Sequence, residues 1–102
     1  MVNGTSTPTT TRPAWSVYVL RCADGSLYTG ITNDLGRRLL AHRAGKASKY
    51  TRSRLPVRMM CTIGPWRTRG RALSEEARIK AMPRDEKLAL IRAYARAIRA
   101  RR

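Results

Sequence analysis

The chain has few acidic residues, one histidine and two cysteines, and these shortages exclude several kinds of active site. His42 is the only histidine, and neither cysteine has another cysteine or a histidine at the spacing of a zinc site, so a zinc hydrolase with three protein ligands is not expected. Six carboxylates among 102 residues are too few for a carboxylate-rich centre with two metal ions. No glycine-rich phosphate-binding loop occurs. An enzyme built from this inventory must use Tyr, Arg, His and one or two carboxylates.

Long apolar runs are also missing, because no segment approaches the roughly 18 apolar residues of a membrane-spanning helix. Residues 1–14 contain Thr, Pro and Ser but lack the charged and apolar regions of a secretory signal, so we predict a flexible N-terminal arm. At this chain length we expect one domain, over residues 15–99, followed by a basic tail at 100–102. The two isolated cysteines are expected to be buried thiols in a cytoplasmic protein.

Positive charge is abundant instead. The chain has 22 Lys and Arg against six Asp and Glu, with a formal net charge of +16 and a pI near 11.6. Nucleic acid is the favoured polyanionic partner, because each phosphate that is neutralised releases counterions. An anionic membrane is the competitor, but an interfacial helix carries large apolar side chains on one face. The C-terminal segment offers an ordinary core stripe instead, made of Leu88, Ile91, Ala95 and Ile98.

The residue pattern predicts three strands. Residues 15–22 are rich in β-branched and aromatic types with apolar side chains on both faces, which is typical of a central strand. The Asp24-Gly25 pair is a strong hairpin signal, and residues 27–31 form the returning strand. Residues 56–63 have alternating apolar side chains, and Gly64-Pro65 is expected to end this third strand.

Three helices complete the pattern. Residues 35–44 have helical spacing after the capping side chains of 32–34, and residues 46–55 are predicted to be a polar, basic surface loop. Thr68 can cap a second helix, and a third runs from Pro83 to about Arg99. The expected fold is therefore α/β (α+β), a small three-stranded antiparallel sheet flanked by helices in the order β-β-α-β-α-α.

Several motifs occur in an order that resembles the GIY-YIG nuclease family. Tyr18 within Val-Tyr-Val and the Tyr-Thr-Gly of residues 28–30 are similar to the paired-strand signature of that family. The similarity continues through Asn33-Asp34-Leu35, Arg37-Arg38, His42, Gly45-Lys46, Ser48 to Arg52, Ala72-Leu73, Glu76 and Lys80. It covers about Trp15 to Ile91 and is most like the small stand-alone bacterial branch typified by YhbQ and YazA. The ordered series is far more specific than one aromatic-glycine motif.

This resemblance implies an endonuclease that hydrolyses DNA phosphodiester bonds. By the resemblance, Tyr18 and Tyr28 place phenolic hydroxyls beside the scissile phosphate, and Tyr28 orients or deprotonates the attacking water. Arg38 stabilises charge that develops on the phosphoryl oxygens. His42 positions the nucleophile or relays its proton. Gly30 lets the backbone pass close to the site.

The resemblance also implies a divalent ion and a nucleic-acid-binding surface. Glu76 would hold one Mg²⁺ or Mn²⁺ ion whose other ligands are mostly water and phosphate, and no small-molecule cofactor is expected. Tyr50 is expected to stack on a base or to pin its loop. The nucleic-acid-binding set comprises Arg37, Lys46, Lys49, Tyr50 and Arg52.

Simpler interpretations stay open for each residue. A strand Tyr is commonly half-buried packing, and Glu76 could pair with Arg37, Arg71 or Lys80 at the surface. Besides a structure-selective, repair-related endonuclease, the sequence is compatible with a non-catalytic DNA- or RNA-binding protein on a nuclease scaffold, or with a ribosome-associated protein. Glu76 favours the nuclease, because a pure binding module has no need of a lone acid among basic helices.

Overall fold

A computed structural model of the chain describes the backbone of residues 14–100 and the side chains of residues 14–95. Of the predicted arm (1–14) and the predicted tail (100–102), residues 1–13 and 101–102 lie outside this range. In chain order the elements are β2 (Trp15–Arg21), β3 (Leu27–Thr32), α1 (Leu35–Arg43), α2 (Lys49–Arg52), β4 (Arg58–Trp66), α3 (Arg69–Lys80) and α4 (Arg84–Ala100). The predicted fold class is confirmed, and α2 is an additional short helix.

The three strands form one antiparallel sheet in the order β3-β2-β4. β2 is central, as its apolar residues on both faces predict. Between β2 and β3 the chain turns at Gly25, whose φ of +86° is a conformation that favours glycine. In this register Tyr18 of β2 lies opposite Gly30 of β3 and opposite Thr62 of β4.

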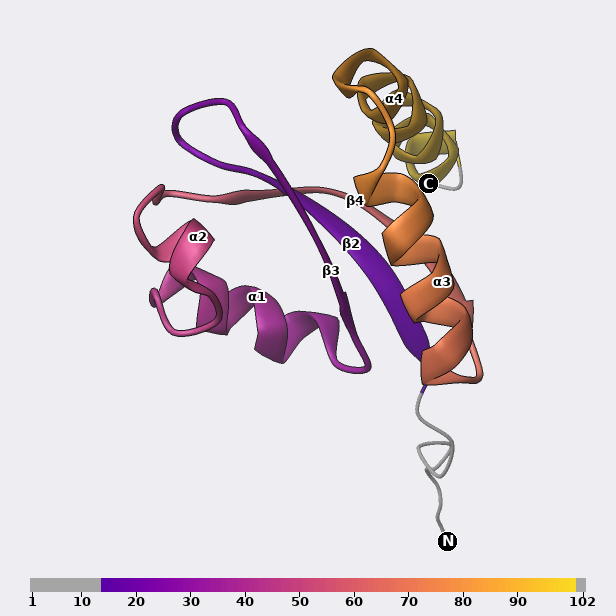
Figure 1. Cartoon of the computed structure of the whole chain (residues 1–102), viewed down its shortest axis with the longest axis horizontal. Coiled ribbons are helices and arrows are strands. Elements are labelled where there is room, and N and C mark those ends of the chain that lie inside the picture. The colour runs from indigo at the N-terminus through magenta and orange to yellow at the C-terminus, as the bar shows by residue number, and fades with distance from the viewer. Residues whose placement is uncertain (1–13, 101–102) are drawn as a thin grey trace, which may run out of the picture.

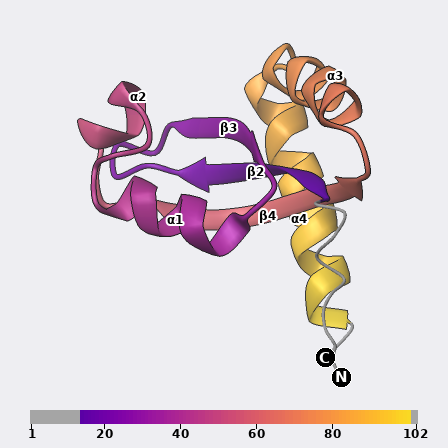
Figure 2. The same ribbon diagram turned by 90° about the horizontal axis from the view of Figure 1, so that it is seen from below.

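Alternate residues of β2 supply the two hydrophobic cores. Tyr18 and Leu20 face the first core, where α1 contributes partly buried leucines such as Leu39. Val17 and Val19 face the second core, to which α3 and α4 contribute Ile79 and Ile91. Figures 1 and 2 show the consequence, with α1 and α2 on one side of the molecule and α3 and α4 on the opposite side.

Two of the helices begin at the residues that the sequence predicts. The Asp34 side chain accepts a hydrogen bond from the Arg37 amide at the start of α1, and the Thr68 side chain accepts one from the Arg71 amide at the start of α3. Both caps satisfy amides that have no partner within the helix. Within residues 14–100, none of the helices has the length and apolarity needed to cross a bilayer.

Two local predictions are wrong. The third strand was expected over residues 56–63, but β4 begins at Arg58 and continues through Pro65 to Trp66. Proline is tolerated there because β4 is an edge strand and has a ladder on one side only. The basic segment 46–55 is not entirely loop, since Ser48 accepts a hydrogen bond from the Thr51 amide at 3.1 Å and caps α2.

The opposition of Gly30 and Tyr18 predicts a cost for any larger side chain. A Cβ at Gly30 would lie 2.5 Å from Oη and 2.6 Å from Cζ of the buried Tyr18 ring. We expect Gly30→Ala to lower the free energy of unfolding by about 1–3 kcal/mol, the usual cost of overpacking, as measured by urea denaturation.

Gly70→Ala is the matched control. Gly70 lies in the first turn of α3 and has no heavy atom within 4 Å of an added Cβ. Alanine is a better helix former than glycine by roughly 0.5–1 kcal/mol, so this variant should be as stable as the wild type or more stable. Equal destabilisation by the two substitutions would contradict the packing role of Gly30.

Candidate active site

A buried tyrosine and a buried histidine form the centre of the candidate site. Tyr18 from β2 is 2% exposed and His42 from α1 is fully buried, with Tyr18 Oη 2.7 Å from His42 Nε2. Burial is the main cause of both pKa changes, because it disfavours the charged forms: the pKa of Tyr18 rises above its ordinary value, and that of His42 falls below. A neutral phenol and a neutral imidazole therefore meet at neutral pH.

The other nitrogen of His42 is also engaged. His42 Nδ1 lies 2.9 Å from Thr51 Oγ1, and Thr51 Oγ1 lies 2.9 Å from Ser48 Oγ. Thr51 is fully buried, so α2 docks on α1 through this hydroxyl. Thr51 was not among the predicted site residues, and its place within the Ser48 to Arg52 motif was the one signal that pointed to it.

Tyr28 lies over the buried pair, on the same face of the sheet. Its half-buried ring is 6.4 Å from the Tyr18 ring and 5.2 Å from the His42 ring, measured between centroids. Tyr50 from α2 stacks on Tyr28 at 5.9 Å with an angle of 25° between the ring planes. Tyr50 was expected either to stack on a base or to pin its loop. Its stacking on Tyr28 corresponds to the second role.

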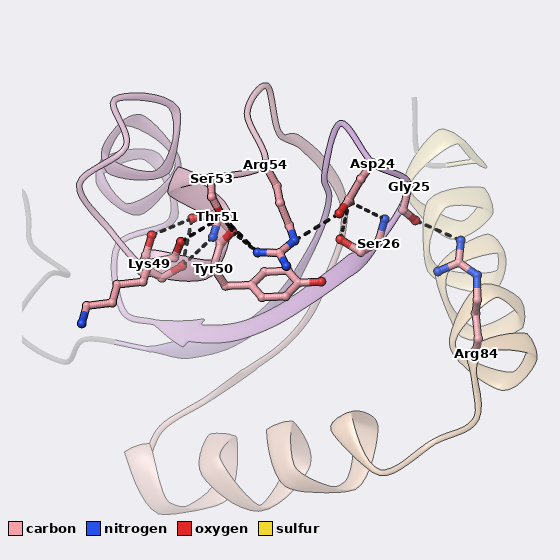
Figure 3. A network of polar contacts seen from close by, with 10 residues as sticks. Asp24, Gly25, Ser26, Lys49, Tyr50, Thr51, Ser53, Arg54 and Arg84 are labelled. Atoms are coloured by element: carbon pink, nitrogen blue, oxygen red, sulfur yellow. Dashed lines mark hydrogen bonds and ion pairs between the residues drawn. The ribbon is translucent and has the colours of Figure 1, made fainter.

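Arg54 holds Tyr50 in place (Figure 3). Its guanidinium carbon lies 3.8 Å from the centre of the Tyr50 ring, and its Nη1 donates a hydrogen bond of 2.9 Å to the Tyr50 carbonyl. Its Nε donates to Asp24 Oδ2 in the hairpin turn at 3.1 Å. Hydrogen bonds from Ser26, and then the charge of Arg54, lower the pKa of Asp24. Arg54 was not among the predicted site residues, because it lies outside the motifs.

Arg37 and Arg38 are both exposed on the first turns of α1. They line a hollow of about 240 Å³ together with Thr32, Asn33, Asp34 and Ala41. Arg38 also acts on the buried pair, because its positive charge lowers the pKa of Tyr18 and that of His42. Its guanidinium is thus accessible to an anion and electrostatically coupled to the aromatic cluster.

Glu76 approaches the same cluster from α3, which packs against β3. Its side chain is 17% exposed and forms an ion pair of 3.4 Å with Lys80. Its negative charge raises the pKa of Tyr18, after the larger effects of burial and Tyr28. Glu76 and Arg38 therefore influence Tyr18 in opposite directions.

The Glu76 carboxylate is the kind of donor that suits a hard divalent ion. Within the part of the chain that the structure describes, no group of three His, Cys, Asp or Glu side chains could hold a metal. Mg²⁺ keeps several water molecules and binds through one or two carboxylates plus substrate phosphates. The single, largely buried carboxylate of Glu76 could supply one such ligand.

Apart from Arg37, which lines the first hollow, and Tyr50, which stacks on Tyr28, the predicted residues fall into two groups. Tyr18, Tyr28 and His42 are in ring contact, and Arg38 and Glu76 act on Tyr18 electrostatically. The second group comprises Lys46, Lys49 and Arg52. These residues line a separate hollow of about 210 Å³ beyond the end of α1, together with Gly45, Ala47 and Ser48. Gly30 makes room for the Tyr18 ring, which is a packing reason for its place in the motif.

The GIY-YIG catalytic domain model matches residues 14–88. The chain belongs to the GIY-YIG family. Its relatives place it among the small bacterial UPF0213 proteins of that family. It is 51% identical over 75 residues to UPF0213 protein OB0043 of Oceanobacillus iheyensis, covering 74% of this chain and 86% of the relative. It is 48% identical over 77 residues to a UPF0213 protein of Nitratidesulfovibrio vulgaris, covering 76% of this chain and 69% of the relative.

Two solved structures resemble this GIY-YIG domain. The UPF0213 protein BH0048 of Bacillus halodurans is 38% identical with a TM-score of 0.53, over 80% of this chain and 86% of that one. EF2693 of E. faecalis is also 38% identical, with a TM-score of 0.51 over 76% of this chain and 82% of that one. The likeness supports the same β-β-α-β-α-α arrangement.

The environment of His42 in this GIY-YIG domain predicts a pH dependence of stability. Burial, and then the charge of Arg38, hold the pKa of His42 below its ordinary value of 6.5. Below about pH 6.5, His42 therefore binds a proton in the unfolded chain but stays neutral in the folded protein until the pH reaches its lower folded-state pKa. The free energy of unfolding should fall as the pH decreases through this window.

The single histidine makes this prediction directly measurable. We expect the imidazole signals in an NMR titration to report a pKa below 6.5, and the fall in stability between pH 7 and the folded-state pKa to be absent from His42→Gln. An imidazole that titrates at or above 6.5 in the folded protein would contradict the buried, neutral assignment.

Proposed function

We propose that the protein is a metal-dependent endonuclease that hydrolyses DNA phosphodiester bonds, acting on branched, nicked or damaged DNA. The proposal rests on one observation: Tyr28, Arg38 and Glu76, from β3, α1 and α3, all influence the pKa of the buried Tyr18. The ring of Tyr28 also lies 6.4 Å from the ring of Tyr18, measured between centroids, which gives the influence of Tyr28 a geometric basis. A hydroxyl that can orient water, an accessible guanidinium that can stabilise phosphoryl charge and a carboxylate that can hold a metal are together sufficient groups for metal-dependent phosphodiester hydrolysis.

Each residue has a separate task. Arg38 binds the non-bridging oxygens of the scissile phosphate and stabilises the charge that develops on them. The Tyr28 hydroxyl orients the attacking water and accepts or passes on its proton. Glu76 holds the divalent ion, which when bound supplies Lewis-acid stabilisation of the phosphoryl oxygens.

Tyr18 and His42 take positioning roles, because both are buried. The hydrogen bond between Tyr18 Oη and His42 Nε2, at 2.7 Å, fixes the platform on which Tyr28 lies. Because the Tyr18 phenol is protonated and the His42 imidazole is neutral, neither side chain is an anion that could compete with the substrate for Arg38. In these proposed roles, neither Tyr18 nor His42 contacts the substrate directly.

The charge distribution supports nucleic acid as the substrate. Between Asp34 and Glu75 the sequence has no acidic residue, whereas lysines and arginines recur throughout that segment. Phosphate contacts of this kind make affinity fall steeply with salt concentration. We therefore expect binding that tolerates many sequences and weakens strongly between low and moderate salt.

Incubation with DNA in the presence and absence of metal tests the proposal. The substrates are supercoiled plasmid and matched linear, nicked and branched duplexes, in Mg²⁺, Mn²⁺ or excess chelator. The expected result is cleavage that requires the metal and is fastest on one of the non-linear forms. DNA that is bound but stays intact in both Mg²⁺ and Mn²⁺ would contradict the nuclease proposal.

One observation favours a second candidate, a non-catalytic DNA- or RNA-binding protein. Glu76 forms an ion pair with Lys80 at 3.4 Å, so it has a partner that does not involve a metal. In this case the protein would retain salt-dependent binding to duplex DNA or RNA without cutting either. Running the same assay on an RNA duplex of matched sequence separates the two nucleic acids.

A further inference from the structure

The hollow beyond the end of α1 has the composition of an anion site. Lys46, Lys49 and Arg52 contribute three cations to its lining, and all three are exposed. Within residues 14–95 the ion pairs involve other cations, namely Arg54, Arg78 and Lys80. The three positive charges of the hollow are therefore not balanced by a carboxylate from that part of the chain.

The walls of this hollow are built from fixed backbone. Gly45 has a φ of +75° and turns the chain out of α1. The Lys46 amide donates to the Ala41 carbonyl at 2.8 Å, and the Arg52 amide donates to the Ser48 carbonyl at 3.1 Å. A Cβ at Gly45 would lie 3.4 Å from Cγ of Arg52, so the Arg52 stem lies against this turn. The hollow is thus largely preformed.

A chain of hydrogen bonds joins one wall of the hollow to the candidate active site. Ser48 Oγ lies 2.9 Å from Thr51 Oγ1, which lies 2.9 Å from His42 Nδ1. His42 Nε2 in turn lies 2.7 Å from Tyr18 Oη. An anion that accepts a hydrogen bond from Ser48 would therefore bias the donor and acceptor roles along the chain as far as Tyr18.

We propose that this hollow is a second phosphate-binding site, which holds a backbone phosphate of the nucleic acid away from the cleaved bond. Arg37 and Arg38 line the first hollow near the start of α1, and the second hollow follows its end. The nine residues of α1 span about 14 Å at roughly 1.5 Å per residue. Because one hollow lies near the start of this helix and the other beyond its end, we expect them to contact two different phosphates of one substrate.

The identity of the anion as a nucleic-acid phosphate rests on the proposed function, whereas the binding of a phosphate group does not. Arginine and lysine with a hydroxyl donor are suited to phosphate oxygens. A backbone phosphate and free inorganic phosphate share this chemistry, and the following experiments distinguish them.

The first experiment titrates the full chain with inorganic phosphate and follows backbone amide and histidine ring signals by NMR. Amides of residues 45–52 and the His42 ring should shift in the wild type. The shifts should be lost when Lys46, Lys49 and Arg52 are all changed to Ala. The control changes Arg58, Arg67 and Arg92 to Ala, which removes the same charge from exposed positions elsewhere. Equal loss of the shifts in both variants, or none in the wild type, would overturn the site.

The second experiment places one neutral methylphosphonate at successive positions of a duplex and measures binding without metal. Wild-type affinity should fall at the position that contacts Arg38 and at a further position a few nucleotides away. The variant with Lys46, Lys49 and Arg52 changed to Ala should be insensitive only at the further position and show a salt slope smaller by about one phosphate contact. If no remote position matters, the hollow does not hold the backbone, even if free phosphate binds.

Thr51→Val tests the link to the active site. Valine keeps the shape of threonine but removes the hydroxyl between Ser48 and His42. Phosphate should still shift the amides of residues 45–52 with an affinity within about threefold of the wild type, but the His42 ring should no longer respond. A persistent response of His42 would show that the hydroxyl chain does not transmit binding.

These outcomes separate the inference from the proposed function. Sensitivity at a remote phosphate in a protein that cuts neither DNA nor RNA would leave the phosphate site standing and remove the nuclease proposal. Cleavage of DNA that does not depend on a remote phosphate would support the nuclease proposal and remove the inference that this hollow holds a backbone phosphate.

Discussion

Glu76→Gln is expected to reduce metal-dependent DNA cleavage by on the order of 10³-fold, because a bound divalent ion contributes several kcal/mol to transition-state stabilisation. The substitution keeps the size of the side chain and removes the charge that would hold the ion. DNA binding should persist or tighten, since one negative charge is removed from a basic surface. The measurement is the single-turnover rate at saturating protein, with affinity determined separately.

Glu75→Gln is the matched control for this result. Glu75 is the preceding residue of α3 and pairs with Arg78 at 2.9 Å, with a side chain 22% exposed. It carries the same charge as Glu76 but does not act on the Tyr18 pKa in the way that Glu76 does. Its substitution should leave the rate within a few-fold of the wild type. Undiminished cutting by Glu76→Gln, with loss in Glu75→Gln, would move the metal to Glu75.

Arg38→Ala is expected to slow the cleavage of bound DNA by on the order of 10²–10³-fold, the magnitude typical of a preorganised group that stabilises developing charge. Arg38 is exposed at the first hollow, and its charge lowers the pKa of both Tyr18 and His42. Affinity should change much less than the rate, because the chain has 22 lysines and arginines and many of them remain available to contact the DNA backbone.

Arg92→Ala removes the same charge from a position without a proposed chemical role. Arg92 is exposed on α4, which packs against β4 rather than against the aromatic cluster. We expect a change in affinity and in salt slope of about one phosphate contact or less, with an unaltered rate on bound DNA. If both variants lose cleavage only in proportion to lost binding, Arg38 is one more surface cation and the binding-protein alternative is better.

Much of the fold could be predicted because its signals are local. The apolar residues on both faces of residues 15–22 predict the central strand, and the Asp-Gly pair predicts the hairpin. Asp34 and Thr68 cap their helices with side chains close in sequence to the amides they satisfy. Such features depend on neighbours within a few residues, so the sequence alone reveals them.

The remaining features depend on contacts between distant segments. Pro65 stays in a strand because that strand is at an edge, which only the assembled sheet determines. Thr51 and Arg54 are surface-type residues in a basic segment, yet one is buried against His42 and the other lies over Tyr50. Tertiary packing, rather than local pattern, assigns their roles.

The burial of His42 could not be predicted for the same reason. Its position four residues after Arg38 places the two on one face of a helix, but that spacing does not decide which side chain faces the sheet. The structure places His42 inside and Arg38 outside. The proposed division into positioning residues and substrate-contacting residues rests on this difference.

The most direct test of the account is single-turnover cleavage from a preformed complex of the wild-type protein with branched DNA. Binding is first saturated in chelator, and Mg²⁺ in excess then starts the reaction. We predict that the bound DNA stays intact until the metal is added and is then cut within one turnover. Saturated DNA that remains intact in Mg²⁺ and in Mn²⁺, or that is cut equally fast in chelator, would contradict the assignment of this site as a metal-dependent nuclease.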